Sequence, residues 1–156
     1  MADNVIDQIK KAVMTYPTDK VDVTITSFGV VSPPGGLLNV GDVFRFKVKI
    51  ENKGCLVMTN AKAHVFGTEW ADVSTASGGP FSQGPVENLT NFVVAAFGSY
   101  ETGWFYGKAK KRCDPDTKTI VLADLGHWDA SLQYILDSAS MEGPKEGKLD
   151  QIIYPA

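Results

Sequence analysis

The stretch that decides the fold reads VFRFKVKIENKG over residues 43–54. Apolar and charged side chains alternate along it, and strict alternation is typical of a β-strand with one face in a core and the other in water. The residues after it, Asn52-Lys53-Gly54, tolerate a positive φ and predict a turn. We therefore expect one face of this strand to be core, namely Phe44, Phe46, Val48 and Ile50.

Similar alternation extends the pattern in both directions. Val21, Val23 and Ile25 alternate with polar residues before the Pro33-Pro34-Gly35-Gly36 break. After the turn, alternate apolar residues over 61–65 predict the next strand, which we expect to be the antiparallel neighbour of 43–52.

The remainder of the chain predicts further short strands. Residues 68–91 are rich in Ser, Gly and Pro without a sustained period, so we expect a long surface loop there. We then expect a hairpin pair at 92–97 and 103–110, strands at 118–123 and 131–137 separated by a loop at 126–129, and a last edge strand at 152–154. This pattern predicts a single domain over 1–156, mainly β, folded as an immunoglobulin-like antiparallel β-sandwich of about seven to nine strands over 20–156, with an insertion at about 69–117.

The N-terminal stretch has a different period. Val5, Ile6 and Ile9 recur at helical spacing, and Pro17 ends the pattern. A short amphipathic helix is therefore predicted over residues 4–15.

Composition narrows the class of protein. Of the 156 residues, 44% are hydrophobic and 21% charged, and the formal net charge is −3. These values are typical of a soluble globular chain and do not favour a nucleic-acid partner. No apolar run has the length of a membrane span, and the start lacks a signal peptide, so we expect a cytoplasmic protein or one released without a classical signal. Cys55 and Cys113 are expected to be free thiols.

Five segments together resemble the bacterial adhesion-related immunoglobulin-like domains called CARDB. The segments are VDVTI at 21–25, GDVFRFKVKIENKG at 41–54, NAKAHV at 60–65, LADLG at 122–126 and SLQYIL at 131–136. The resemblance covers about half of the chain and implies a bacterial or archaeal sandwich domain with a binding role. It differs from the family in the insertion at 69–117 and in standing alone rather than in tandem.

Catalytic and metal-binding motifs are not evident. The sequence contains no nucleophile elbow, zinc-protease, phosphate-loop or dinucleotide fingerprint, so we expect neither an enzyme nor a cofactor. Asp114-Pro115-Asp116 has too few oxygen donors for a calcium loop and is interpreted as a type I turn, with no metal. His64 falls on the polar face of its strand, where we expect it to be exposed.

Aromatic and basic residues are the better functional candidates. Trp104, Phe105 and Tyr106 are consecutive, so alternation sends at least one large ring away from the core, unless a second layer or the N-terminal helix covers that face. Trp70 and Trp128 fall in expected loops, and a basic run lies at 108–112. The predicted ligand- or partner-binding residues are Trp70, Trp104, Tyr106, His127, Trp128, Lys110 and Arg112.

Three functions are compatible with these features. The first is a non-catalytic binding or assembly module that presents loops and an edge strand to a protein partner, including a second copy of itself. The second is a carbohydrate-binding module that uses the outward rings as stacking platforms. The third is a hydrolase built on His127, Asp129 or Asp124.

Overall fold

The computed structural model describes residues 20–31, 34–87, 91–125, 127–131, 139–142 and 146–156. Its regular elements within these ranges are all β-strands. Of 127–131 and 139–142 only the backbone is described. The predicted helix at 4–15 and nearly all of the predicted strand at 131–137 lie outside the described residues.

The first layer is one antiparallel sheet. Its strands lie in the order β1 (Val21–Val30), β2 (Val43–Asn52), β9 (Phe105–Ala109) and β5 (Ala71–Ser74), and β8 (Ser99–Glu101) also pairs with β2. Thr102 lies between β8 and β9, where its amide donates to Val48 O at 2.9 Å and its hydroxyl accepts from Val48 N at 3.0 Å. The two short strands β8 and β9 therefore pair with β2 one after the other, as two parts of one interrupted strand.

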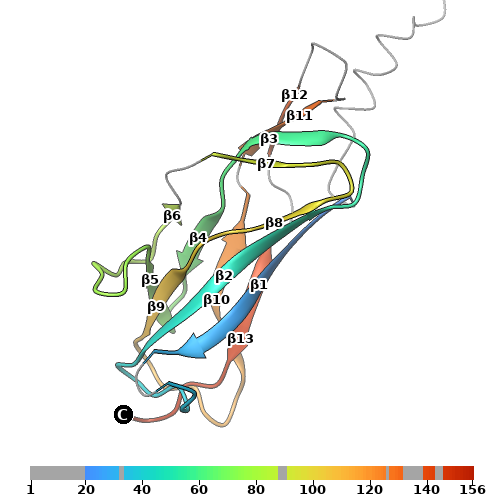
Figure 1. Ribbon diagram of the computed structural model, residues 1–156. Coiled ribbons are helices and arrows are strands. Elements are labelled where there is room, and N and C mark those ends of the chain that lie inside the picture. The colour runs from blue at the N-terminus through green and yellow to red at the C-terminus, as the bar shows by residue number, and fades with distance from the viewer. Residues whose placement is uncertain (1–19, 32–33, 88–90, 126, 132–138, 143–145) are drawn as a thin grey trace, which may run out of the picture.

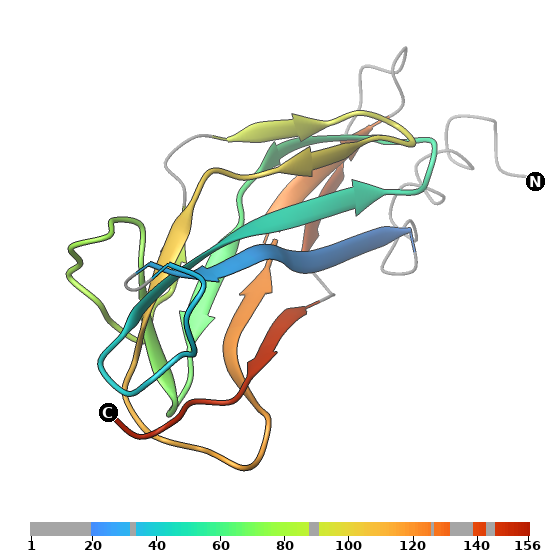
Figure 2. The same ribbon diagram turned by 60° about the horizontal axis from the view of Figure 1, so that its bottom comes forward.

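The second layer is a bent sheet. One half has the order β13 (Gly147–Gln151), β10 (Lys118–Asp124), β4 (His64–Gly67) and β6 (Val86–Glu87), and the other has β12 (Ala139–Glu142), β11 (His127–Ser131), β3 (Val57–Ala61) and β7 (Phe92–Val94). Only Lys62 and Ala63 separate β3 from β4, and only residues 125 and 126 separate β10 from β11. The two halves are therefore successive parts of the same strands: β3 runs directly into β4 in Figures 1 and 2, and β10 lies behind β2 in Figure 1.

The core lies between the layers, and the expectation for β2 is confirmed. Phe44, Phe46, Val48 and Ile50 are all 0% exposed. The Phe105 ring stacks on Phe46 with centroids 5.9 Å apart, and the second layer contributes residues of β10 to the same core. This confirms a mainly β, antiparallel fold whose inward faces pack against each other.

Two pairing expectations are wrong. The predicted strand at 61–65 is not a neighbour of β2, because it falls at the end of β3 and the start of β4, which pair with β11 and β7 and with β10 and β6 in the other layer. The segments at 92–97 and 103–110 are likewise not a hairpin, since β7 pairs with β3 whereas β9 pairs with β2. The apolar face of a sheet must pack against another layer. Here the chain forms that layer by crossing to the other sheet instead of forming a hairpin with the preceding strand.

The expected loop at 68–91 contains strand structure. Ala71 and Val73 of β5 are 0% exposed, and β5 pairs with β9 over four residues. The alternation in β5 covers only four residues within a Ser- and Gly-rich segment, so this strand was not predicted from the sequence. Similarly, His127 and Trp128 lie in β11 and not in a loop.

The last residues are core instead of an edge strand. Ile153 is 0% exposed, and its amide and carbonyl bond to Cys113 Sγ at 3.2 Å and Cys113 N at 2.9 Å. Tyr154 N donates to Leu38 O, and Tyr154 O accepts from Val40 N, each at 2.9 Å. Tyr154 thus forms an isolated parallel β-bridge with Asn39, and no edge strand longer than this bridge exists at 152–154. Cys113 is buried, Cys55 is exposed, and both are free thiols, which confirms that they form no disulfide with each other.

Candidate functional site

The best candidate is the outward surface of the first layer around Trp104. Along β9, Phe105 and Gly107 point into the core, so Trp104 and Tyr106 point outward by alternation. Gly107 occurs where it does because the Phe44 ring lies against it and leaves no room for a β-carbon. The expectation that at least one of these rings points away from the core is confirmed, since both are only half-buried and neither packs on the core cluster.

Two cations from β2 lie over the Trp104 ring. Arg45 Cζ is 4.1 Å and Lys47 Nζ 4.6 Å from its centroid. Arg45 and Tyr106 are directly paired across the two strands. We call the surface formed by Arg45, Lys47, Lys49, Trp104 and Tyr106 the Trp104 face. Cation–π contacts of this kind hold an aromatic ring in place at an exposed site.

Positive charge exceeds negative charge around this ring. Lys47 Nζ lies 3.7 Å from Glu101 Oε1, and Thr26 Oγ1 donates to Glu101 Oε2 at 2.9 Å. Within the described part of the chain, Arg45, Lys49 and Lys108 form no ion pair. Of the three cations of the Trp104 face, Lys47 is therefore paired with a carboxylate, whereas Arg45 and Lys49 have no carboxylate partner among the described residues.

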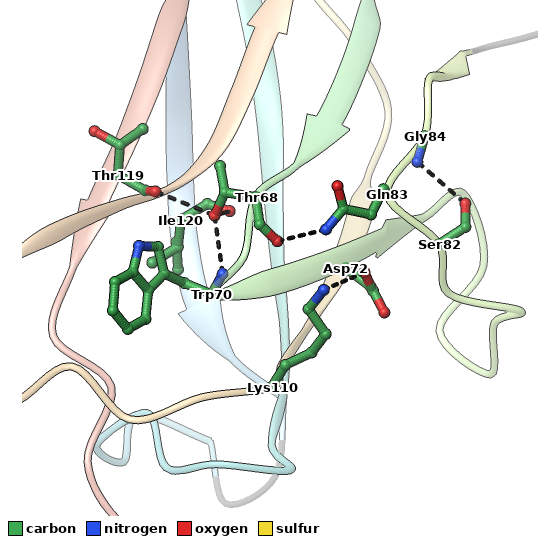
Figure 3. Close-up of polar contacts among 9 residues, drawn as sticks. All are labelled: Thr68, Trp70, Asp72, Ser82, Gln83, Gly84, Lys110, Thr119 and Ile120. Carbon is green, nitrogen blue, oxygen red and sulfur yellow. Dashed lines mark hydrogen bonds and ion pairs between the residues drawn. The ribbon is translucent and has the colours of Figure 1, made fainter.

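The structure does not bring Trp70 to this face. Ala71 pairs with Ala109, which places Trp70 near the far end of β9, roughly 20 Å from Trp104 along the strand. Trp70 N donates to Thr68 Oγ1 at 3.2 Å, and Thr68 Oγ1 donates in turn to Thr119 O or Ile120 O at 3.2 and 3.1 Å (Figure 3). The ring packs partly on the core, so folding accounts for Trp70.

Most cations of the basic run at 108–112 form ion pairs with nearby carboxylates. Lys110 Nζ lies 3.0 Å from Asp72 Oδ1, a pair that Figure 3 also shows, and Lys111 Nζ lies 3.4 Å from Glu69 Oε2. Arg112 Nε lies 2.6 Å from Asp114 Oδ1. Lys110, Lys111 and Arg112 thus each have a carboxylate partner, whereas Lys108 has none among the described residues, so Lys110 and Arg112 contribute little net field to a partner. The other two candidates, His127 and Trp128, pair through their backbones with Glu142 and Met141 of β12.

A polar cluster on the second layer was not anticipated. His64 Nε2 lies 2.7 Å from Glu87 Oε2, and His64 Nδ1 lies 3.6 Å from Asp124 Oδ1. The three residues are direct cross-strand partners on β6, β4 and β10. His64 is therefore half-buried instead of exposed as expected. Sequence spacing gave no signal, because the cluster depends on the register of three strands.

The cluster does not form a metal centre. Among the described residues, no three His, Cys, Asp or Glu side chains are grouped to hold an ion. Asp124, a residue of the hydrolase hypothesis, here faces His64 across paired strands. The arrangement joins three strands by charge and hydrogen bonding, and it adds no support to that hypothesis.

The strand order defines the class of protein. In immunoglobulin lettering, β1, β2, β8–β9 and β5 occupy positions A, B, E and D of one layer, and β13, β10 and β4 occupy G, F and C of the other. The strand β6 is added beside β4 and follows β5 in the chain. The protein is thus an immunoglobulin-like β domain with an extra strand in the second layer.

Comparisons with known proteins add no family name. No family model and no curated protein matches the chain. Among solved structures, the Northeast Structural Genomics Consortium target SoR45 is 12% identical with a TM-score of 0.41, covering 84% of this chain and 86% of that one. The ASH/PapD-like domain 7 of human CEP192 is 14% identical with a TM-score of 0.35, covering 92% of each chain. The resemblance to CARDB domains stays a prediction.

The described residues include no helix of the length and apolar character needed to span a bilayer.

Proposed function

We propose that the protein is a non-catalytic binding module whose Trp104 face holds an acidic, extended segment of a protein partner. The observation that carries the proposal is the position of Arg45 and Lys47 over a tryptophan that lies outside the core. Folding alone does not require this arrangement, because Phe105 already fills the core position of the strand. Residues that folding leaves unexplained are where function is best sought.

The spacing of the cations supports an extended segment. Arg45, Lys47 and Lys49 are alternate residues of one strand, so they recur about every 6.7 Å along the face. Alternate side chains of an extended peptide have the same spacing. Glutamate or aspartate at alternate positions would therefore meet successive cations, while an apolar or aromatic side chain packs beside Tyr106.

A carbohydrate ligand is less well supported. Sugar rings bind by lying flat on an exposed aromatic face, whereas here two cations lie over Trp104. Cations favour carboxylates over neutral hydroxyl groups because a charge-assisted hydrogen bond is stronger. The protein-binding role that the CARDB resemblance implies is consistent with this choice.

Binding of a fluorescein-labelled peptide of alternating Glu and Val residues, followed by anisotropy, tests the proposal. Arg45→Glu reverses a charge beside the ring, and Lys148→Glu makes the same change on β13 of the other layer. We expect Arg45→Glu and Trp104→Ala to weaken binding about tenfold or more and Lys148→Glu to leave it within about twofold. Equal affinity of Arg45→Glu and the parent would overturn the proposal, as would a glycan array on which Trp104→Ala abolishes binding to neutral sugars.

A further inference from the structure

Glu51 ends the run of cations along the outward side of β2. It is the next outward residue after Lys49, about 6.7 Å farther along the strand. At the opposite end of the same row, Val43 pairs with Lys108 of β9, which is exposed and forms no ion pair within the described part of the chain. The row therefore ends in a carboxylate on one side and lies beside a further cation on the other.

Folding does not account for a carboxylate at position 51. Glu51 and Asp22 are direct cross-strand partners on β2 and β1, and like charges directly opposite each other destabilise a sheet. Lys53 pairs with Asp22, whose hydrogen bond and charge raise the pKa of Lys53, and the charge of Glu51 adds to that effect. Glu51 itself forms no ion pair with a described residue. A neutral side chain would avoid the repulsion, so the carboxylate points to a cation that comes from elsewhere.

The surface beside Glu51 has room for such a cation. A shallow cleft there is lined by Glu51, Asn52, Lys53, Phe97, Gly98 and Ser99. Ser99 is the cross-strand partner of Glu51 on β8, so a hydroxyl group and a carboxylate lie side by side. Both groups accept hydrogen bonds, and the side chains of lysine and arginine carry only donors. The cleft therefore suits the charged end of a basic side chain.

We infer that Glu51 is a specificity-determining residue of the Trp104 face, which selects a basic residue at one end of the bound acidic segment. The inference rests on the proposed function, because Arg45 and Lys47 must first hold the segment. An extended segment repeats its side chains at the spacing of β2, so the residue two positions beyond the acid at Lys49 meets Glu51. Lysine or arginine forms an ion pair there, whereas an acid is repelled.

The two ends of the row also give the bound segment one orientation on the face. A basic residue at the Val43 end meets the charge of Lys108, and a basic residue at the other end meets Glu51. The segment therefore lies with its basic residue beside β8 and its acids towards β9. The partner sequence that fits is a row of alternate acids with a base two positions from the last acid.

Two labelled peptides test this by fluorescence anisotropy. One has the sequence EVEVEVK and the other EVEVEVQ, each with fluorescein at the N-terminus and an amide at the C-terminus. They differ only in the charge of the last side chain, and the amide keeps a terminal carboxylate from cancelling it. We expect the parent to bind the lysine peptide about three- to fivefold more tightly, the upper range of an exposed ion pair.

Glu51→Gln removes the carboxylate and keeps the shape of the side chain. We expect this variant to bind the two peptides with affinities within about 1.5-fold of each other. Asp116→Asn is the matched control, because Asp116 is exposed in the segment between β9 and β10, and it should keep the preference of the parent. The urea midpoint of Glu51→Gln should equal or exceed that of the parent, since the repulsion from Asp22 is removed.

Glu51→Lys supplies the opposite charge and should reverse the preference, so that the glutamine peptide binds more tightly. Equal affinities of the parent for the two peptides would contradict the inference, as would a lysine preference that persists in Glu51→Gln. In both cases the proposed function stands if Arg45→Glu still weakens the binding of both peptides. If the parent binds neither peptide, or Arg45→Glu binds both as the parent does, the proposed function fails and the inference fails with it.

Discussion

Gly107 lies against the outer end of the Phe44 ring, and a β-carbon on Gly107 would overlap three atoms of that ring, Cζ, Cε2 and Cε1. The two residues are cross-strand partners on β9 and β2. The contact lets a large ring occupy the layer interface next to β9 without separating the strands.

Gly107→Ala should therefore destabilise the protein by about 1 to 3 kcal/mol, because the added methyl group overpacks the core. Gly103→Ala is the control, since a β-carbon added to Gly103 would meet nothing within 4 Å and its φ is ordinary. Urea unfolding midpoints compare the two variants. A Gly107→Ala midpoint equal to that of Gly103→Ala would show that the Phe44 ring can move aside.

Phe46→Ala should lower the free energy of unfolding by about 3 to 5 kcal/mol through lost burial and a cavity. Lys47→Ala, one residue away, should cost less than about 1 kcal/mol, because its ion pair with Glu101 is partly exposed. Unfolding curves in guanidinium chloride measure both effects, because variants with equal m-values can be compared by their midpoints. Similar losses for the two variants would contradict the observed faces of β2.

The two tryptophans should respond differently to removal. Trp70→Ala should cost about 1 to 3 kcal/mol, because its ring packs partly on the core. Trp104→Ala should cost about 1 kcal/mol or less, the value of exposed cation–π contacts. Thermal unfolding by circular dichroism distinguishes them, and a larger loss for Trp104→Ala would assign that ring a structural role.

Asn52→Ala should destabilise the protein by about 1 to 3 kcal/mol, since it removes the buried donor to Leu56 O and Ala95 O. Ser99→Ala serves as the control, because Ser99 is exposed at the start of the nearby strand β8. Hydrogen exchange adds a local measurement. The backbone amides of Phe97 and Gly98, in the turn between β7 and β8, should lose protection in Asn52→Ala and not in Ser99→Ala. Unchanged exchange there would mean that other contacts hold the turn.

The thiols should differ in accessibility. Cys55 should react promptly with a maleimide in the native protein, whereas Cys113 should react only after unfolding. Intact-mass measurement under native and denaturing conditions counts the labels. Rapid double labelling of the native chain would contradict the packing of Cys113 against Ile153.

Long alternating segments were predictable, whereas their partners were not. The eight residues from Phe44 to Glu51 reveal a strand and its buried face because the pattern repeats several times. The pairing of that strand with β9 instead of the next segment depends on contacts between distant residues. Local periodicity does not encode those contacts.

In the candidate site, too, local patterns were predictable and contacts between distant strands were not. Alternation predicted that at least one ring among Trp104, Phe105 and Tyr106 points away from the core, but the charged residues Arg45 and Lys47 were predicted only to face solvent. Their association with Trp104 follows from the register between β2 and β9. Trp70 and the basic run were chosen because folding did not explain them, and the contacts to Thr68, Asp72 and Glu69 now do.

The bonds of Ile153 and Tyr154 also affect the order in which the protein is built. These residues occupy core and loop positions formed by Leu38, Val40 and Cys113, which the ribosome synthesises much earlier. During translation, that end of the sandwich remains open until residue 154 has emerged. Newly made chains therefore expose apolar surface until residue 154 has been added, and nascent chains stalled before Ile153 are expected to need chaperone protection.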